Sequence, residues 1–426
     1  MIEIRRIKAL DAVVRAPPSK AHTLRALFIA ALAEGISTIK NPLLANDQLT
    51  AIKALEKFGV KIDREKQGKE LVVRGSGGQL KLPKKVDAGE SGVTMRFLAS
   101  LASVAGRQGQ VCTIDASPRM RKRPVDGLVD SLRGLGAVAT YAKTNGFPPI
   151  NVEGSTLFGG KAFINARHSS QFLSSLLIAA PYAEEDVELV VDGVVASKPY
   201  IEITLETMGD FGVKVGREGF KRFSIQSGQR YKARQYGVEG DYSSAAYFFA
   251  AAAVTRGKVR VKNLRRDTKQ GDAIFPKLLE RMGCFVKRIG NEIEVQGPDK
   301  LKPVSADMRG CPDIAMTLAV VAAFANGKSA IENVSHLRLK ESDRLAATIG
   351  CLRKIGAKAE TNGTDIIVYG NPKKLHGATI DPRNDHRIAM SLAVAGLKVR
   401  GMKILGEECV QKSFPNFWEE LEAIGN

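Results

Sequence analysis

The chain has 426 residues, more than a single hydrophobic core usually organises, and therefore predicts two domains of about 200 residues each. Its 44% hydrophobic and 26% charged residues are typical of a soluble globular protein and exclude a disordered chain. The net charge of +19 predicts anionic partners.

The N-terminal and cysteine patterns favour a cytoplasmic protein. The first residues, MIEIRRIKAL, lack the apolar segment of a signal peptide, and no apolar run reaches the roughly 18 residues of a membrane span. The cysteines form no CxxC pair and no Cys/His ligand spacing, so we expect neither a disulfide framework nor a metal site. They are Cys112, Cys284, Cys311, Cys351 and Cys409.

The positive charge leaves two kinds of anionic partner open. Lysine and arginine are spread along the chain without a basic tail, and aromatic residues make up only 6%. The sequence therefore lacks the aromatic platform of single-strand binding proteins, and it shows no helix-turn-helix or RNP-like signature. A pocket for small, multiply charged anions is favoured over a basic nucleic-acid-binding module.

Six alanine-rich segments follow one another along the chain. Each begins with small or polar residues, continues with apolar residues at helical spacing, and ends in a β-branched stretch that predicts a strand. They span residues 19–41, 91–114, 169–191, 243–263, 312–333 and 384–406. At two of these starts, Ser243 and Asn384, we expect no more than a helix N-cap.

A second helix is predicted in each interval, ending at a glycine before another strand. These glycines are Gly59, Gly136, Gly212, Gly283, Gly356 and Gly425. The repeat recurs about every 70 to 78 residues, too long for a solenoid repeat, so each copy is predicted to be a small β/α subdomain.

The six copies are predicted to divide into two lobes of three. The division lies near residues 237–244, GVEGDYSS, where a glycine-flanked polar stretch separates two apolar segments. One lobe is predicted to contain residues 19–239 and the other residues 1–18 and 240–426. The second assignment supposes that the N-terminal strand pairs with the second half of the chain.

Charged residues gather at the starts of the alanine-rich helices. Helix N-termini carry unpaired N–H groups and a partial positive charge, so several converging starts would form an anion site. The dipole disfavours cations at that end unless an anion is also present. The residues are Lys20, Arg25, Arg96, Ser169, Ser170, Asp313, His386 and Arg387.

A series of motifs resembles the EPSP synthase family, the 3-phosphoshikimate 1-carboxyvinyltransferases. In chain order they are PPSKAHTLRALFIAALA, ESGVTMRFL, PRMRKRP, SSQFLSSLLIAAP, SKPYIEITL, EGDYSSAAYF, PDIAMTLA, RLKESDRL, NDHRIAMSLAV and KSFPNFWEEL. The resemblance covers essentially the whole chain. It implies an α/β fold of the α+β type, a two-lobed inside-out barrel of six βαβαββ repeats, three per lobe, with the active site in the cleft between the lobes.

The resemblance also implies a reaction. The enolpyruvyl group of phosphoenolpyruvate is transferred to the 5-hydroxyl of shikimate 3-phosphate by addition and elimination, and phosphate is released. The family uses no metal and no cofactor, and we expect a monomer that binds neither nucleic acid nor a membrane. Both substrates carry a phosphate and a carboxylate, so the pocket needs several cations.

The resemblance assigns two sets of binding residues. For shikimate 3-phosphate they are Lys20, Ala21, Arg25, Ser169, Ser170, Gln171, Ser197, Tyr200, Asp313, His336 and Lys340. For phosphoenolpyruvate they are Lys20, Gly92, Arg96, Arg123, Gln171, Arg344, His386, Arg387 and Lys412.

Four residues are implied in catalysis. Asp313 matches the base for the hydroxyl, and flanking cations should keep it ionised. Glu341 matches the acid that protonates the methylene carbon, with Lys20 as a competing donor. His386 could donate a hydrogen bond to the departing phosphate, or could be a helix cap or a packed side chain.

Three positions depart from the family's common pattern. Ala21 stands where serine is common, which removes one hydroxyl contact to the shikimate phosphate. Glu90 stands where asparagine is common, and His336 stands where asparagine is frequent. None of these changes removes a cation.

The nearest enzyme alternative is the related enolpyruvyl transferase that acts on UDP-N-acetylglucosamine. That family relies on a cysteine in a mobile loop, whereas the candidate here, Cys112, lies in an apolar, strand-like stretch. The motifs RLKESDR and NDHR favour the shikimate enzyme.

Overall fold

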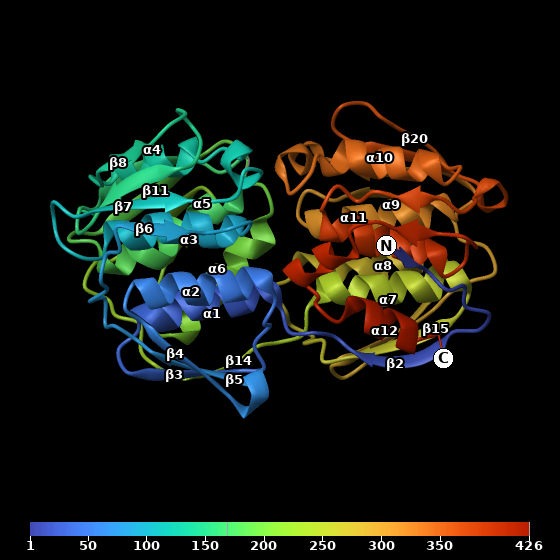
Figure 1. The fold of residues 1–426 in the computed structure, drawn as a ribbon, viewed down its shortest axis with the longest axis horizontal. Coiled ribbons are helices and arrows are strands. Elements are labelled where there is room, and N and C mark those ends of the chain that lie inside the picture. Colours follow the sequence, from blue (N-terminus) through green and yellow to red (C-terminus); the bar gives the residue numbers. More distant parts are fainter. Residues whose placement is uncertain (168, 426) are drawn as a thin grey trace. The chain divides into compact units, whose positions relative to one another are not determined.

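The computed structural model describes residues 1–167 and 169–425. Its contacts divide the chain into two compact units (Figure 1). Unit 1 contains Met1–Pro17 and Glu239–Asn426, and unit 2 contains Pro18–Val238. Each unit has its own hydrophobic core. The chain therefore passes from one unit to the other twice, after Pro17 and after Val238.

One strand arrangement recurs in both units. In the second sheet of unit 2, β6 (Lys85–Asp87) pairs in parallel with β7 (Val111–Asp115), and β7 pairs antiparallel with β9 (Ile150–Glu153). The edge strand β8 (Ala139–Tyr141) then pairs antiparallel with β9. Helix α3 (Gly92–Ser103) separates β6 from β7, and a second helix separates β7 from β8. This sheet and its helices therefore form one βαβαββ repeat.

The other four-stranded sheets have the same strand order. In unit 2 they use β3 (Ile36–Lys40), β4 (Lys61–Glu65), β5 (Glu70–Arg74) and β14 (Gln235–Gly237), and then β10 (Gly160–Asn165), β11 (Val187–Asp192), β12 (Gly216–Glu218) and β13 (Arg222–Ile225). The remaining helices of unit 2 are α1 (Lys20–Leu32), α2 (Asn46–Lys57), α4 (Asp126–Gly134), α5 (Ser170–Ala179) and α6 (Lys198–Asp210), with short helices η1 (Lys66–Gly68), η2 (Met120–Lys122) and η3 (Ala180–Tyr182).

Unit 1 contains two four-stranded sheets and one three-stranded sheet. Their strands are β2 (Asp11–Arg15), β15 (Lys258–Lys262), β16 (Phe285–Ile289) and β17 (Glu292–Gln296); β18 (Ser305–Asp307), β19 (Gly327–Glu332), β20 (Lys358–Thr361) and β21 (Ile366–Gly370); and β1 (Ile2–Glu3), β22 (Thr379–Ile380) and β23 (Lys403–Ile404). The helices are α7 (Tyr242–Thr255), α8 (Phe275–Arg281), α9 (Ala315–Ala323), α10 (Arg344–Lys354), α11 (His386–Gly396) and α12 (Phe417–Ala423), with short helices η4 (Gly271–Ile274), η5 (Pro312–Ile314), η6 (Ser335–Leu339), η7 (Pro372–Lys374) and η8 (Glu407–Lys412).

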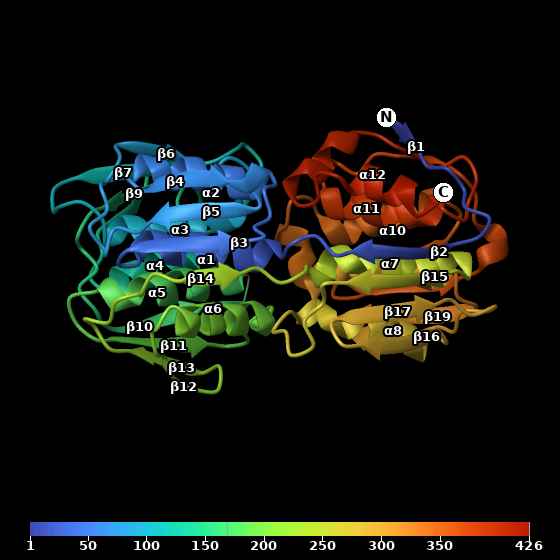
Figure 2. The same ribbon diagram turned by 90° about the horizontal axis from the view of Figure 1, so that it is seen from below.

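Two sheets take their first strand from a distant part of the chain. In unit 1, β2 pairs in parallel with β15, and Figure 2 shows the two strands beside helix α7. In unit 2, β14 pairs in parallel with β3. The predicted pairing of the N-terminal strand with the second half of the chain is confirmed by the β2–β15 register.

The sixth repeat differs from the prediction of six complete βαβαββ units. Its sheet has three strands, and the third is β1, from the start of the chain, which pairs antiparallel with β23. No strand follows α12 in the described residues. The other five predicted glycine caps have left-handed backbone, with φ between 84° and 99°, and each leads into a further chain segment. Gly425 does not have this backbone conformation.

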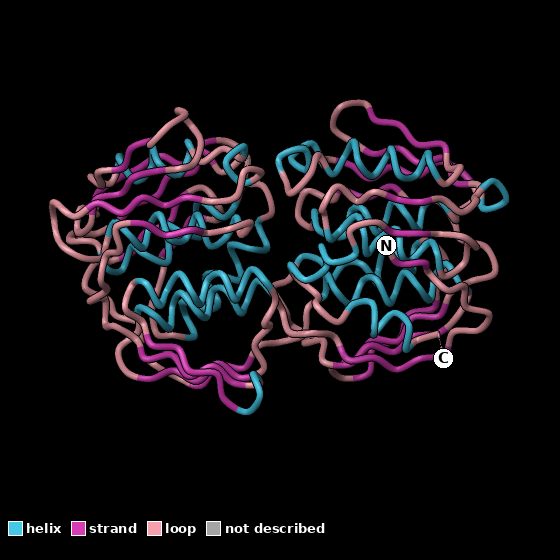
Figure 3. The backbone as a smooth tube through the Cα atoms, viewed as in Figure 1, coloured by secondary structure: helices cyan, strands magenta, loops and turns pink. Residues whose placement is uncertain are grey.

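The alanine-rich helices form the interior of each unit. Every residue of α11 is buried, as are eleven of the thirteen residues of α1. A helix that is apolar on all sides is stable only when it is covered on all sides, and alanine combines a small volume with high helix propensity. Figure 3 shows these helices between the strands of each unit.

Two predicted helix caps are wrong. The N-cap of α7 is Asp241, whose side chain accepts a hydrogen bond from the Ser244 N–H, while Ser243 instead donates to the Asp272 carboxylate. The N-cap of α11 is Asp385 and not Asn384. In both cases a carboxylate close by in sequence replaces the predicted cap, because the stronger, charged acceptor takes the helix N–H groups.

No helix among the described residues is long and apolar enough to cross a membrane.

Candidate active site

Three serines cap the buried helices α1, α3 and α5 of unit 2. Ser19, Ser91 and Ser169 each accept a hydrogen bond from a backbone N–H in the first turn of the following helix. Each cap satisfies one of the N–H groups that a helix start leaves unpaired. Three of the predicted site residues of unit 2, Lys20, Gly92 and Ser170, directly follow these caps.

Arg25 is a buried guanidinium between α1 and α6. Its Nε donates to Thr204 Oγ1 at 2.7 Å, and its two terminal nitrogens donate to the carbonyl oxygens of Tyr200 at 2.9 Å and Ala21 at 3.1 Å. Among the described residues it makes no ion pair, and burial lowers its pKa to about 10. A buried cation that contacts neutral groups is costly, so Arg25 is well placed to receive an anion.

A pair of guanidiniums, those of Arg96 and Arg123, lies at the start of α3. Arg96 donates to Gln171 Oε1 at 2.5 Å and, more weakly, to the Gly92 carbonyl at 3.4 Å. Arg123, which follows η2, lies on the same side: a Cβ built on Gly92 would come within 2.8 Å of Arg96 Nη1 and 2.9 Å of Arg123 Nη1. The absence of a side chain at Gly92 therefore gives both guanidiniums access to the helix start.

Three other predicted residues of unit 2 lie at the starts of α1, α5 and α6. Lys20 begins α1, and its Nζ lies 2.6 Å from Asp47 Oδ2. Ser170 begins α5 and is buried. Ser197 is the N-cap of α6 with left-handed backbone, and its carbonyl oxygen accepts a hydrogen bond from the Tyr200 N–H at 3.1 Å. Asp47 was not predicted, although it holds the ammonium group expected to lie between the substrates.

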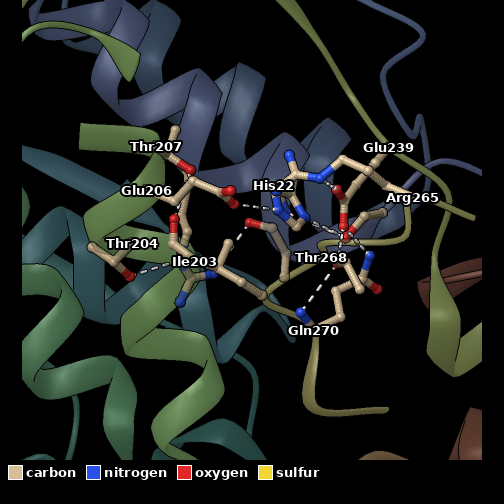
Figure 4. Close-up of polar contacts among 12 residues, drawn as sticks. His22, Ile203, Thr204, Glu206, Thr207, Glu239, Arg265, Thr268 and Gln270 are labelled. Atoms are coloured by element: carbon tan, nitrogen blue, oxygen red, sulfur yellow. Dashed lines mark hydrogen bonds and ion pairs between the residues drawn. The ribbon is translucent and has the colours of Figure 1, made fainter. Parts of the chain in front are cut away.

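His22 forms a separate polar group within unit 2. Its Nδ1 lies 2.9 Å from Ser19 Oγ, and its Nε2 lies 3.7 Å from Glu206 Oε2 (Figure 4). This histidine follows the first cap by three residues and ties the start of α1 to α6.

Arg344 is the centre of the ion-pair network in unit 1. Its Nε donates to Asp385 Oδ2 at 2.8 Å, its Nη1 donates to Asp313 Oδ1 at 3.0 Å, and its Nη2 lies 2.8 Å from Glu341 Oε2. Asp385 is fully buried and also accepts a hydrogen bond from Ser342 Oγ at 2.9 Å. The network therefore joins the start of α10 to η5 and to the start of α11.

Asp313, in η5, is bound by two guanidiniums. Arg387 Nη2 donates to its second oxygen at 3.2 Å, while Arg344 binds the first. Burial alone would raise the pKa of Asp313, but the charges of Arg387, Arg344 and Lys340 hold it well below its usual value. The flanking cations therefore favour the ionised form of this carboxylate.

Of three more predicted residues of unit 1, one begins α11 and the other two lie in short helices that pack on α10 and α11. His336, in η6, is buried, and its burial, followed by the charge of Lys340, lowers its pKa to about 3. His386 begins α11, with Nδ1 3.8 Å from Asp385 Oδ1. Lys412 is buried at the end of η8, which packs on α11. The structure thus joins Asp313, Glu341, Arg344 and Arg387 directly through hydrogen bonds or ion pairs.

A further buried carboxyl, Asp272 in η4, was not predicted. Ser243 Oγ donates to it, and burial together with the charge of Asp313 raises its pKa to about 7. Its side chain reaches the start of α7 through Ser243, where the sequence suggested only a capping serine. A carboxyl with such a pKa affects the pH dependence of folding.

We expect Asp272→Asn to become progressively more stable than the wild type as the pH rises from 4 to 7. Asp272 keeps its proton in the folded chain up to about pH 7, whereas in the unfolded chain it loses the proton near 3.8, so its stabilising contribution is lost as the pH rises. Urea unfolding midpoints at several pH values measure the difference. Asp299→Asn, at a fully exposed aspartate, is the control and should show no such trend.

Three side chains bind Glu239, the first residue of the segment Glu239–Asn426 of unit 1. Gln270 Nε2 donates to Glu239 Oε1 at 2.6 Å, Thr268 donates to the same oxygen, and Arg265 Nε lies 3.1 Å from the other (Figure 4). These bonds fix the backbone that leads from the second crossing of the chain into α7, which carries Ser243 and Tyr247.

Among the described residues, no group of three or more His, Cys, Asp or Glu side chains is arranged to hold a metal ion. The described cysteines are all free and buried, and burial raises the pKa of Cys112, in β7, to about 12.

Comparisons with known proteins agree with the motifs. The family model of EPSP synthase (3-phosphoshikimate 1-carboxyvinyltransferase) matches residues 4–421. The 3-phosphoshikimate 1-carboxyvinyltransferase of Methanosphaerula palustris is 44% identical over 418 residues, which are 98% of this chain and 97% of that protein. The protein of the same name from Methanocaldococcus jannaschii is 38% identical over 427 residues, 100% of this chain and 98% of that protein.

A solved structure supports the same conclusion. EPSP synthase from Acinetobacter baumannii matches with a TM-score of 0.83 and 27% identity, over 99% of this chain and 97% of that chain. The predicted two-lobed α/β fold is thereby confirmed. The chain belongs to the EPSP synthase family of 3-phosphoshikimate 1-carboxyvinyltransferases and catalyses enolpyruvyl transfer in the shikimate pathway.

Proposed function

We propose that residues of both units form one active site, in which the 5-hydroxyl of shikimate 3-phosphate attacks phosphoenolpyruvate. The observation that carries the proposal is Asp313, a carboxylate bound by the buried guanidiniums of Arg344 and Arg387. The functional division into lobes, residues 19–239 and residues 1–18 with 240–426, is part of this proposal, as are a cleft between the lobes and a monomeric enzyme in the cytoplasm.

We assign shikimate 3-phosphate chiefly to the caps and helix starts of unit 2. Arg25 would bind its carboxylate in a bidentate manner, because this guanidinium is buried and makes no ion pair among the described residues. Ser169, Ser170 and Ser197 would donate hydroxyl hydrogen bonds to its phosphate, and Tyr200 would contact the ring. Gln171, Lys340 and His336 complete this set as proposed ligands.

Phosphoenolpyruvate would be bound by guanidiniums from both units. Arg96 and Arg123 flank the open helix start at Gly92, where helix N–H groups and two cations can share one anion. Arg344, Arg387 and Lys412 would bind the second anionic group from unit 1. Binding would supply these cations with counter-ions that they now draw partly from Asp313.

This exchange of counter-ions has a chemical consequence for Asp313. A base whose pKa is far below neutrality accepts a proton poorly. When substrate anions neutralise Arg344 and Arg387, the field that depresses the Asp313 pKa weakens, and its basicity rises. Substrate binding would therefore prepare the base for the hydroxyl proton.

The proton for the methylene carbon would come from Glu341, with Lys20 as the alternative donor. Glu341 Oε2 lies 2.8 Å from Arg344 Nη2, and Lys20 Nζ lies 2.6 Å from Asp47 Oδ2, so each proposed donor forms an ion pair. His386 would donate to the departing phosphate. Ala21 leaves one hydroxyl contact of the phosphate site unfilled.

Phosphate release tests the proposed substrates. The protein is mixed with phosphoenolpyruvate and either shikimate 3-phosphate or UDP-N-acetylglucosamine, and we expect release only with the first. Cys112→Ala should leave turnover unchanged, because this thiol is fully buried in β7. Release with UDP-N-acetylglucosamine, or loss of turnover in Cys112→Ala, would favour the alternative transferase. No release with shikimate 3-phosphate would overturn the proposal.

We expect Gly92→Ala to raise the KM for phosphoenolpyruvate by about tenfold with a smaller effect on kcat, because losing one hydrogen bond to a charged group costs about 1.5 kcal/mol or more. The added methyl group would push against Arg96 and Arg123 at 2.8–2.9 Å. Steady-state kinetics measure both constants. Gly209→Ala is the matched control, since a Cβ there meets no atom within 4 Å. Equal KM values in the two variants would contradict the placement of phosphoenolpyruvate at α3.

A further inference from the structure

We propose that unit 1 carries a second anion site, outside the active site, that binds a small oligophosphate. The site is a hollow of about 540 Å³, within the range of roughly 300–1,000 Å³ that is usual for small-molecule pockets. Its lining residues are Glu3, Ile4, Arg5, Arg6, Lys8, Arg400 and Gly401. Four of these seven residues are cations.

The backbone that presents the cations is fixed. The Ile4 N–H donates to the Met402 carbonyl and the Ile7 N–H donates to the Leu397 carbonyl, both at 2.9 Å. The side chains of Ile4 and Ile7 are buried, and Ile4 packs against Gly396, where a Cβ would come within 2.5 Å. Because the isoleucines anchor the segment, the residues beside them are held at the surface.

The four cations are not neutralised by the protein. Arg5, Arg6, Lys8 and Arg400 are exposed and form no ion pair among the described residues, while the one acid of the hollow, Glu3, lies 3.7 Å from Lys403. The surplus charge also acts on Lys398. Burial is the main cause that lowers the pKa of this lysine, and the charges of Arg256 and Arg6 lower it further.

The position at the end of α11 explains only part of this charge. The C-terminus of a helix carries roughly −0.5 of an elementary charge, which favours one nearby cation but cannot balance four. Helix α11, with 11 residues, is about 16 Å long at 1.5 Å per residue, and its other end carries His386 and Arg387. The hollow is therefore separated from the proposed catalytic residues.

The charge and the volume together select the ligand. A single carboxylate would leave most of the positive charge unbalanced, whereas a chain of phosphates offers several charges and many acceptor oxygens to guanidinium forks. A nucleic acid would need a basic track that extends beyond one hollow. Inorganic triphosphate is the probe that matches this chemistry.

The test is calorimetric titration of the whole enzyme with inorganic triphosphate. Shikimate 3-phosphate is present at saturation to occupy its part of the active site. We expect one bound triphosphate per chain, weakened about tenfold or more when Arg5→Gln, Arg6→Gln and Arg400→Gln are combined, because charge-assisted hydrogen bonds are lost. Turnover should remain at the wild-type value, and Arg400→Gln alone should weaken binding partially.

The control removes three cations of unit 1 from other exposed positions, with Lys287→Gln, Lys302→Gln and Lys373→Gln. It should bind triphosphate like the wild type. The proposal is overturned if triphosphate does not bind, if the control weakens binding equally, or if Arg123→Gln abolishes it. A short single-stranded oligonucleotide that binds where triphosphate does not would also overturn it. The comparison of the triple variant with its charge-matched control does not depend on which residues bind the substrates.

Discussion

Asp313→Asn is expected to lower kcat by about 10²–10⁴-fold, the usual contribution of a general base, while shikimate 3-phosphate still binds. An amide keeps the shape of the side chain and can still accept from Arg344, but it cannot take the hydroxyl proton. Since the pKa of Asp313 lies well below its usual range, its ionisation should produce no acid limb in kcat/KM between about pH 5 and 8.

Single-turnover kinetics and equilibrium binding separate the two effects of this substitution. Asp307→Asn, at an exposed carboxylate in β18, is the control and should retain wild-type kcat. If Asp313→Asn turns over at the wild-type rate, the base lies elsewhere. If it no longer binds shikimate 3-phosphate, the loss of kcat cannot be ascribed to proton transfer.

Asp385→Ala is expected to destabilise unit 1 by about 3–5 kcal/mol, the cost of leaving a buried charge without its partner. The carboxylate is fully buried, binds Arg344 through both oxygens, and caps α11 through the Arg387 N–H. We also expect a higher KM for phosphoenolpyruvate, because the Arg344 guanidinium loses its anchor and the start of α11, which carries Arg387, loses its cap.

Asp343→Ala separates the ion pair from the cap. Asp343 is the N-cap of α10 and is about one-third exposed, so its removal should cost only about 1 kcal/mol. Urea unfolding followed by circular dichroism compares the two variants. Equal shifts in the unfolding midpoint would show that Asp385 acts only as a helix cap.

The repeat was predictable because several signals coincide in every copy. An alanine-rich run, a glycine at the end of the second helix and β-branched strands recur together, and each is a strong local signal. The incomplete sixth sheet was not predictable in this way. Its third strand, β1, has only two residues and comes from the opposite end of the chain.

The caps show where local reasoning ends. Asn384 and Asp385 are both good N-caps by propensity, and the choice between them depends on Arg344, which binds Asp385. Ser243 is likewise drawn from a cap position by Asp272, which lies 29 positions further along the chain. The contacts with Arg344 and Asp272 are set by tertiary structure, so cap propensity alone does not choose between neighbouring candidates.

In the site, the sequence identified the cations but missed two of the acids that bind them. Motif positions identified Arg25, Arg344 and Arg387, and the structure places all three in the interior. The acids that hold the proposed cations, Asp47 and Asp385, were missed. Asp47 reads as an ordinary acid in the first turn of a helix, but an acid directly before two basic residues, as in NDHR, is a signal that could have identified Asp385.

Strands β2 and β14 each pair with a strand far away in the sequence, and this affects the order in which the two units can fold during synthesis. Unit 2 is one continuous stretch, and its β14–β3 pairing is complete once residue 237 has been synthesised. Strand β2 is synthesised near the beginning but has no partner until β15 follows, so we expect unit 2 to fold first on the ribosome. During that interval β2 is an unpaired edge, and the exposed lysine and arginine residues before it would keep it soluble.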